Sequence, residues 1–213
     1  MRFLINAGPT REMIDEVRFL SNLSSGRTGY AVALAARDLG HTVTLVTGPV
    51  GMSPPRGINV RRVVSALEMQ AAMLDGFSDA DVVVATAAVS DYRPAQRVEG
   101  KLKKSEGGLT LELVRNPDIL AEMGRRKDRQ VLVGFALEVQ DAEQQAQSKF
   151  ERKGLDLLVL NGPGNFGSAR SSFRLLTRNG FEAPREASKE DLGRLLVERA
   201  SELARTRGAS PGE

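Results

Sequence analysis

Short apolar runs alternate with longer segments of helical period along most of this chain. The apolar runs predict β-strands at residues 2–8, 41–48, 80–89, 130–138 and 155–162. Between them, apolar residues that recur every three or four positions predict helices at residues 26–40, 65–77, 116–126 and 141–154. Such alternation is typical of a mostly parallel sheet with helices on both faces. We therefore predict an α/β, Rossmann-like, doubly wound fold.

Two regions depart from this alternation. Residues 90 to about 115 are polar, contain proline and are rich in lysine, which predicts a long flap after the third strand, with residues 109–114 as an extended piece of it. Asn116 is the expected cap of the following helix, with Pro117 in its first turn. Residues 172–187 predict a C-terminal hairpin turning at Asn179-Gly180, before a capped amphipathic helix. We expect one domain over residues 1–205 and a polar tail over residues 206–213.

Composition narrows the class of protein. A chain of 213 residues with 41% hydrophobic content can bury one large core. The net charge of only +3 does not indicate nucleic-acid binding, and the lack of cysteine excludes disulfides and thiolate metal sites. The sequence shows neither a signal peptide nor an apolar run of roughly 18 residues, so we expect a cytoplasmic protein with no membrane partner.

The segments that can carry chemistry follow the predicted strands, where ligands bind in this class of fold. After the first strand, glycines and a helix start offer exposed amides to a phosphate, and the expected phosphate-binding positions are Gly8, Ser24, Ser25 and Gly26. The chain has no P-loop, no G-x-G-x-x-G after the first strand and no Tyr-x-x-x-Lys pair. It therefore has a nucleotide-binding layout with an unusual glycine pattern.

Several separated blocks together resemble one known family. They are "AGPTREMIDEVRFLSNLSSGRTGYAVA", "TLVTGPV", "AAVSDYRP", "KLKK", "LELVRNPDIL", "VGFALE", "KGLDLLVLN" and the gapped "GFGS…LLTRNG". In this order they resemble phosphopantothenoylcysteine synthetase, also called phosphopantothenate cysteine ligase, of coenzyme A biosynthesis. The resemblance covers nearly the whole chain and implies a free-standing bacterial-type form or an isolated ligase domain. It implies no FMN site, and a separate phosphopantothenoylcysteine decarboxylase as a possible partner.

The resemblance also implies a reaction. Bacterial members activate the carboxylate of 4′-phosphopantothenate with CTP, releasing pyrophosphate and forming an acyl-cytidylate. The amine of L-cysteine then attacks the acyl-cytidylate to give an amide and CMP. Such chemistry needs positive charge and oriented N–H donors rather than a nucleophilic side chain. Mg²⁺ is expected with CTP, no residue is assigned as its ligand, ATP is an alternative nucleotide, and a homodimer is expected.

Three residues take catalytic roles by this resemblance: Asn22, Arg18 and Lys101. Asn22 aligns with an asparagine that forms or converts the acyl-cytidylate. Arg18 is suited to a phosphate, and Lys101 to the leaving pyrophosphate or the acyl phosphate. Local pattern alone leaves simpler alternatives open, since Asn22 could cap a helix near Gly26 and the other two could be solvated surface charges.

The resemblance assigns a further set of residues to the nucleotide. They are Ala85, Thr86, Ala87, Asp91, Lys101, Pro117, Asp118, Ile119, Leu120, Phe135, Lys149 and Lys153. Small residues at 85–87 permit close backbone approach, and Lys149 and Lys153 are spaced to share one helical face. By themselves, Phe135 could be a core residue and the lysine pair an exposed surface feature.

Two other classes of function remain open from the sequence. An NAD(P)-dependent oxidoreductase would share the sheet, although its glycine pattern and acidic ribose partner are missing. A non-catalytic nucleotide-binding or nucleic-acid module would use the same basic flap. Fluorescence of bound NAD(P)H would support the first, and strongly salt-dependent nucleic-acid binding without turnover would support the second.

Overall fold

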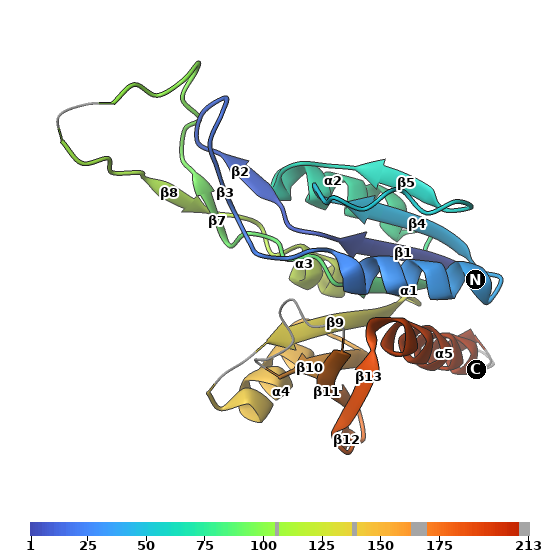
Figure 1. The fold of residues 1–213 in the computed structure, drawn as a ribbon. Helices are drawn as coiled ribbons and strands as arrows, with labels where there is room; N and C mark the ends of the chain where they lie inside the picture. The colour runs from blue at the N-terminus through green and yellow to red at the C-terminus, as the bar shows by residue number, and fades with distance from the viewer. Residues whose placement is uncertain (105–106, 138–139, 163–169, 209–213) are drawn as a thin grey trace.

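Six parallel strands form the main part of the sheet. The computed structural model describes residues 1–104, 107–137, 140–162 and 170–208. Its parallel strands are β1 (Arg2–Ala7), β4 (Thr42–Thr47), β5 (Asn59–Arg62), β6 (Val82–Ala85), β9 (Val131–Leu137) and β10 (Leu157–Asn161). They lie in the order β5-β4-β1-β6-β9-β10 (Figure 1). The predicted α/β class with a mostly parallel sheet is confirmed.

An antiparallel extension continues the sheet beyond β10. Strand β11 (Arg170–Thr177) pairs antiparallel with β10, with β12 (Gly180–Phe181) and with β13 (Arg185–Ser188). The predicted hairpin through Asn179-Gly180 is the β11–β12 turn. Strands β12 and β13 both pair with β11 and, apart from Ser188, lie in the return half of the hairpin predicted over residues 172–187, whereas the interruption between them at residues 182–184 was not predicted. Residues 163–169, which include the "GFGS" part of the last block of the resemblance, lie outside the described residues.

Helices cover both faces of the sheet. Successive side chains of each strand point to opposite faces, so alternate residues of one strand pack against different helices. Helices α1 (Arg27–Asp38) and α5 (Lys189–Gly208) pack on the face that carries Phe3 and Ile5. Helices α2 (Ala66–Phe77), α3 (Ile119–Arg126) and α4 (Ala142–Arg152) pack on the face that carries Leu4. None of the described helices combines the length and the apolar character that crossing a membrane requires.

Two small hairpins form a projection that we call the arm, comprising residues 11–21 and 92–115. Strands β2 (Arg11–Met13) and β3 (Phe19–Ser21) form the first hairpin, and β7 (Tyr92–Pro94) and β8 (Leu113–Arg115) form the second. Figure 1 shows both hairpins extending away from the sheet. The predicted flap is thus the outer half of a two-hairpin arm, and residues 105–106 lie outside the described residues.

The last two residues of the extended piece predicted at 109–114 belong to strand β8. Elsewhere, local expectations differ from the structure at three places. Helix α3 is capped by Asp118, whose Oδ1 accepts from the Ala121 amide at 3.0 Å, whereas the Asn116 side chain donates to the Ser90 carbonyl at 2.8 Å. Edge strand β5 was missed because two of its four residues are arginines. Helix α5 continues to Gly208, through three residues of the predicted tail.

The order of the strands fixes where a ligand can bind. From β1 the chain passes to β4 and β5 on one side, and then returns to β6 on the other side of β1. The loops that follow β1 and β6 therefore diverge above and below the sheet and leave a crevice at their carboxyl ends. The predicted phosphate and nucleotide loops both start there.

Candidate functional site

Two adjoining pockets occupy the carboxyl edge of the sheet. The first pocket has a volume of about 280 Å³ and the second about 230 Å³. Ala87 and Phe135 line both pockets, so β6 and β9 supply the wall between them. Each pocket is within the size of a small-ligand subsite, and together they can take a ligand longer than either.

The first turn of α1 forms one wall of the first pocket. Gly26 is the cap residue, has a φ of 77° and provides no side-chain cap, while the first amide bonded within the helix is that of Tyr30, to the Gly26 carbonyl. The amides of Arg27, Thr28 and Gly29 therefore have no partner within the helix and carry its positive dipole end. The predicted residues Ser24, Ser25 and Gly26 all line this pocket.

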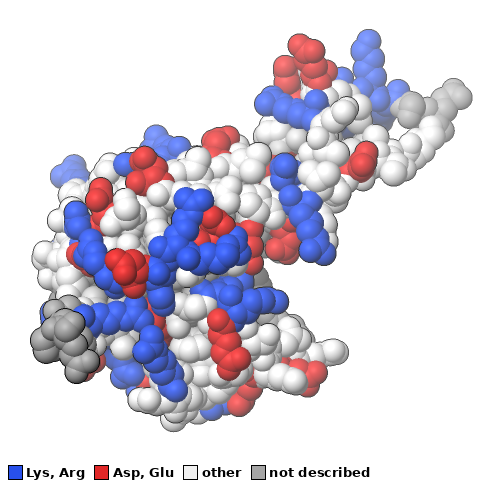
Figure 2. All heavy atoms as spheres, turned by 180° about the vertical axis from the view of Figure 1, so that it is seen from behind, with Lys and Arg blue, Asp and Glu red and all other residues white. Residues whose placement is uncertain are grey.

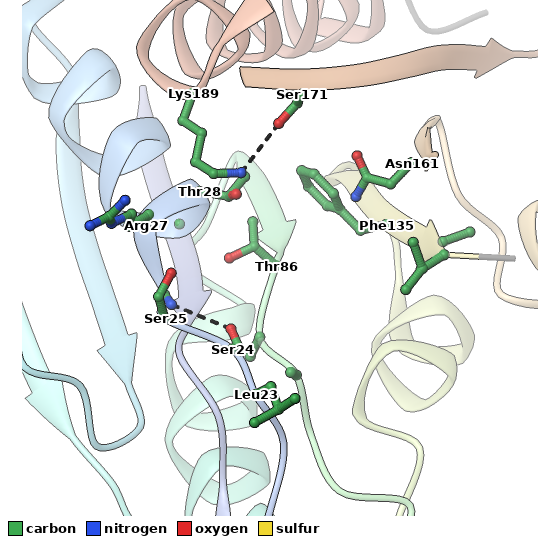
Figure 3. A pocket seen from close by; sticks show the side chains of 16 residues that line it. Leu23, Ser24, Ser25, Arg27, Thr28, Thr86, Phe135, Asn161, Ser171 and Lys189 are labelled. Carbon is green, nitrogen blue, oxygen red and sulfur yellow. Dashed lines mark hydrogen bonds between the residues drawn. The ribbon is translucent and has the colours of Figure 1, made fainter. Parts of the chain in front are cut away.

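Glycine at position 29 brings α1 close to the loop after β6. A Cβ atom at Gly29 would lie 2.4 Å from Thr86 Oγ1 and 2.5 Å from Ala7 Cβ. Thr86 in turn donates to the Asn6 carbonyl at 2.6 Å. The first turn of α1 and the Thr86 side chain thus line one cavity, and Figure 3 shows Thr28 and Thr86 beside it. The predicted nucleotide residue Thr86 belongs to this first pocket and not to the second.

Residues that the sequence did not single out complete the first pocket. Lys189, the first residue of α5, donates from Nζ to Ser171 Oγ of β11 at 3.2 Å (Figure 3). Arg27 and Asn161 line the same pocket. Burial, together with the charge of Arg27, lowers the pKa of Lys189 below its ordinary value. No local pattern could have identified Lys189, because it meets α1 only after the chain has passed through every strand of the sheet.

The second pocket gathers most of the residues predicted to bind the nucleotide. Its lining comprises Asn6, Ala85, Ala87, Val89, Ser90, Asp91, Asn116, Pro117, Asp118, Ile119, Leu120, Phe135, Lys149 and Lys153. Of the predicted nucleotide set, only Thr86 and Lys101 are missing from this lining. Residues of four different segments thus converge, as the resemblance implied. Phe135 is half-buried and lines both pockets, so it is not solely a core residue.

An ion pair balances the charge of the second pocket. Lys153 Nζ lies 2.8 Å from Asp118 Oδ2, and Asp118 also caps α3. Burial would raise the pKa of Asp118, but the hydrogen bonds from Lys153 and the Ala121 amide, and the charges of Lys153 and Lys149, outweigh it and lower that pKa. Gly124 makes this contact possible, because a Cβ there would lie 2.2 Å from the Lys153 carbonyl oxygen.

Two buried polar side chains of the N-terminal segment hold the loop after β6. Asn6 Oδ1 accepts from the Ala87 amide at 2.9 Å, and Thr10 Oγ1 accepts from the Ser90 amide at 3.0 Å. Asn6 and Thr10 are 3% and 0% exposed. Sequence reasoning missed both, although polar residues at the end of an apolar strand could have indicated them. They fix the backbone that forms the wall of both pockets.

Asn22 lies beside this loop and does not cap α1. Its Nδ2 donates to the Ala88 carbonyl at 2.9 Å, and the cap of α1 is Gly26. The alternative interpretation of Asn22 as a helix cap is therefore wrong. Asn22 lines neither pocket, but the Ala88 that it contacts lines the first. Gly8, with a φ of 77°, is likewise buried behind the pockets and lines neither.

Arg18 and Lys101 lie in the arm, away from both linings. Arg18 Nε donates to Asp15 Oδ2 at 2.9 Å, and its Nη2 donates to the Leu102 carbonyl at 2.6 Å. Burial would raise the pKa of the fully buried Asp15, but hydrogen bonds from the Arg18 side chain and three backbone amides outweigh it and hold that pKa well below its ordinary value. Lys101 is exposed next to this cluster.

The pocket residues can be tested for their ability to bind a metal ion. Across the described residues, no group of three or more His, Cys, Asp or Glu side chains is placed to hold a metal ion by itself. Asp91 and Asp118 are the carboxylates among the described pocket residues, and Asp118 is engaged by Lys153. This donor set suits a cation that a phosphorylated ligand brings with it, completed by one protein oxygen.

Comparison with known proteins places the chain in a family. The family model described as the C-terminal domain of DNA/pantothenate metabolism flavoprotein matches residues 1–203. The coenzyme A biosynthesis bifunctional protein CoaBC of Vibrio cholerae is 43% identical over 204 residues, covering 92% of this chain and 51% of that protein. The CoaBC protein of Bacillus subtilis is 49% identical over 159 residues, covering 74% of this chain and 39% of that protein. The chain thus spans about half the length of the curated relatives it matches.

Solved structures give the same result. The crystal structure of the C-terminal domain of CoaBC is 35% identical, with a TM-score of 0.82 over 96% of both chains. A Cab2 mutant in complex with phosphopantothenate-cysteine shares the fold at 13% identity, with a TM-score of 0.79 over 98% of this chain and 89% of that one. Family model, relatives and fold agree, and this chain belongs to the family of the C-terminal domain of DNA/pantothenate metabolism flavoprotein.

Proposed function

We propose that this chain is a phosphopantothenoylcysteine synthetase, which joins 4′-phosphopantothenate to L-cysteine with CTP as the energy source. The observation that carries the proposal is the pair of adjoining pockets at the crevice of the sheet. One has a cationic wall and free helix amides, and the other gathers the residues expected to hold a nucleotide. The names of the CoaBC relatives and the family match support the same pathway over the alternative of an oxidoreductase.

The nucleotide extends across both pockets in this proposal. Its base and ribose enter the second pocket, where Phe135 supplies an apolar face and the balanced Asp118–Lys153 pair offers hydrogen bonds without excess charge. Its phosphates pass Ala87 toward the amides of α1 in the first pocket. We expect CTP to be preferred over ATP, although the lining suggests no rule for the choice of base.

The reaction then needs two displacements. A carboxylate oxygen of phosphopantothenate attacks the α-phosphorus of CTP, and the bond to the leaving pyrophosphate breaks. The cysteine amine next attacks the acyl carbon, the acyl–oxygen bond breaks, and CMP leaves with the electron pair. The chain's part is to hold these groups in line and to stabilise negative charge, through the α1 amides and the neutral Asn22 amide. Asn22 already lies at the Ala88 carbonyl, at the rim of the first pocket.

Mg²⁺ supplies charge neutralisation to the triphosphate when it is bound. The described lining of the first pocket, where the phosphates lie in this proposal, contains no carboxylate, so phosphate oxygens and water would hold most of the cation's coordination shell. The proposed reaction transfers no electrons, so we expect no FMN requirement.

We further propose a homodimer in which the arm carries Arg18 and Lys101 to a site. Neither residue lines a pocket of its own chain, whereas the arm exposes apolar side chains, with Val17 at 59%, Tyr92 at 46% and Leu113 at 42%. Exposed apolar surface on a projecting element is typical of an association surface. Mixing an inactive Asn22→Ala variant with an inactive Lys101→Gln variant should restore activity if the arm acts on the partner's site. No restoration after subunit exchange would place both residues in one chain's site.

The decisive experiment is a turnover assay with purified protein. The protein is mixed with 4′-phosphopantothenate, L-cysteine, Mg²⁺ and either CTP or ATP, and pyrophosphate and the amide product are measured. We expect cysteine-dependent amide with CTP and CMP as the second product. Absence of amide with either nucleotide would exclude the ligase.

Figure 2 shows Lys and Arg side chains interspersed with Asp and Glu on the rear face rather than in a basic stripe, so we expect no salt-dependent nucleic-acid binding.

A further inference from the structure

Lys189 is placed in the first pocket by close packing of two helices. Helices α1 and α5 lie side by side on one face of the sheet (Figure 1). A Cβ atom at Gly193 would lie 2.8 Å from the Ala31 carbonyl carbon and 3.0 Å from the Val32 amide nitrogen. Only glycine permits this approach without displacing the backbone of α1. Because Lys189 lies one turn before Gly193, the same packing sets its side chain beside the first turn of α1.

Three partly buried lysines of this protein differ in how their charge is balanced. Lys127 Nζ lies 3.0 Å from Asp156 Oδ2, and Lys153 Nζ lies 2.8 Å from Asp118 Oδ2. Lys189 instead donates to the neutral hydroxyl of Ser171, and no ion pair of Lys189 occurs within the described ranges. A partly desolvated ammonium without a carboxylate partner is destabilised and is a typical feature of an anion-binding site.

The surroundings of Lys189 reinforce this imbalance. The described lining of the first pocket contains the cations Arg27 and Lys189 and no carboxylate. Burial and the charge of Arg27 lower the pKa of Lys189, and only the neighbouring Glu190 opposes them. Ser171 is 2% exposed, so its hydroxyl fixes the ammonium from the protein side of the pocket. Figure 3 shows the Lys189 side chain extending from α5 into the pocket that Thr28 of the first turn of α1 also lines.

We propose that Lys189, held in place by Ser171, binds a phosphate group of a substrate in the first pocket, together with the amides of the first turn of α1. The ligand class is a phosphate oxyanion, which the ammonium and the amides can contact from adjoining walls. Under the proposed function, on which this identification of the source rests, the group is either the phosphate of 4′-phosphopantothenate or a phosphate of CTP. Lys189 is thus a substrate-binding residue contributed by the C-terminal helix.

Binding of inorganic pyrophosphate tests the site without requiring turnover. Isothermal titration calorimetry would compare the unaltered protein with Lys189→Gln and with Arg194→Gln. Arg194→Gln is the matched control, because it removes one positive charge from the same helix. In the described part of the chain, Arg194 pairs with the exposed Glu198 and lines neither pocket. We expect Lys189→Gln to weaken pyrophosphate binding roughly ten- to a hundredfold, and Arg194→Gln to change it less than about twofold. Lys189→Arg should retain most of the affinity.

Steady-state kinetics identifies the source of the phosphate. A higher KM for 4′-phosphopantothenate in Lys189→Gln, with the KM for CTP unchanged, assigns the site to the phosphopantothenate phosphate, and the reverse pattern assigns it to CTP. Unchanged pyrophosphate affinity together with unchanged KM values would overturn the proposal while leaving the ligase function intact. Conversely, pyrophosphate binding that depends on Lys189 in a protein without ligase turnover would overturn the proposed function and keep the anion site. Thermal unfolding of each variant confirms that it is folded.

Discussion

The two pockets at the carboxyl edge of the sheet have similar volumes but differ in the balance of their charged side chains. In the second pocket, Lys153 is neutralised by Asp118, which also caps α3. In the first, Lys189 has a hydroxyl partner, and the free amides of α1 add further positive potential. A balanced pocket can orient a polar, neutral group such as a base or a ribose, whereas an unbalanced one gains most from an anion. This difference is the reason for proposing that the phosphate end of a ligand lies in the first pocket.

The largest expected effect is that of a substitution at the rim of the first pocket. Asn22→Ala should lower the rate of amide formation by about 10²- to 10³-fold, the usual loss for one transition-state hydrogen-bond donor. Its one hydrogen bond, to the Ala88 carbonyl, is exposed, so unfolding free energy should fall by no more than about 1 kcal/mol. Product mass spectrometry and thermal unfolding measure the two quantities. Unchanged turnover would reduce Asn22 to a loop-positioning residue.

A second variant tests the balanced pocket. Lys153→Gln leaves Asp118 without its cation, so the KM for CTP should rise roughly tenfold while that for 4′-phosphopantothenate changes little. Lys127→Gln is the matched control, since it breaks an ion pair with Asp156 outside both pockets. Equal effects of the two variants on KM would show that stability, rather than nucleotide contact, explains the result.

The pH dependence of anion binding sharpens the comparison further. Because burial and Arg27 lower the pKa of Lys189, this lysine loses its proton at a lower pH than an ordinary lysine. Pyrophosphate affinity should therefore fall several-fold in the alkaline range, below the ordinary lysine value of about 10.4. In Lys189→Arg the cation persists, so calorimetric affinity should stay flat over the same range. Parallel curves for the two proteins would assign the decline to another group.

As pH rises through the pKa of Lys189, folding stability should increase, whereas pyrophosphate affinity should fall. The folded state disfavours the charged form of Lys189, so the unfolded chain binds this proton more tightly. Folding stability relative to Lys189→Arg should therefore increase as pH rises through the lowered folded-state pKa of Lys189, and then level off once the unfolded-state lysine also deprotonates. Urea unfolding at a series of pH values would measure this difference.

The smallest effect separates the two functions of Asp118. Asp118→Asn keeps a capping oxygen for the Ala121 amide but loses the charge that pairs with Lys153. Asp118→Ala loses both, so its unfolding free energy should be lower than that of the Asn variant by about 1 kcal/mol. Chemical denaturation measures this difference. Identical stabilities would mean that the cap contributes nothing measurable to α3.

Much of the fold was predictable because the parallel strands are apolar and the helices amphipathic. Strands β1, β4, β6, β9 and β10 and all five helices lie where the pattern placed them. The elements that were missed, β2, β3, β5 and β7, are short and polar or lie at edges, where hydrophobic alternation is not required. Their conformation is fixed by pairing with another strand: β2 and β3 pair with each other, and β5 pairs with β4, as in the pairing of Thr47 with Arg62.

The candidate site was predictable only in part, and for a related reason. Asp118 and Lys153 could be assigned to one ligand through a resemblance in local blocks, and they share the second pocket. Lys189 carries no local signal, since a lysine at the start of an amphipathic helix is ordinarily a solvated charge. Arg18 illustrates the reverse case, because its loop resembles that of the family while its guanidinium is engaged by Asp15 and Leu102.

The sequence by itself determined the α/β class, the location of ligand-binding loops after the strands, and the residues that resemble a ligase, because periodicity and short motifs are local properties. Only the tertiary structure decided which of these residues share a pocket, and which cations are neutralised. Lys189 and Lys153 look alike in sequence, yet one faces a hydroxyl and the other a carboxylate. The energy of a charge depends on its burial and its neighbours, and these are set by packing between segments far apart in the chain.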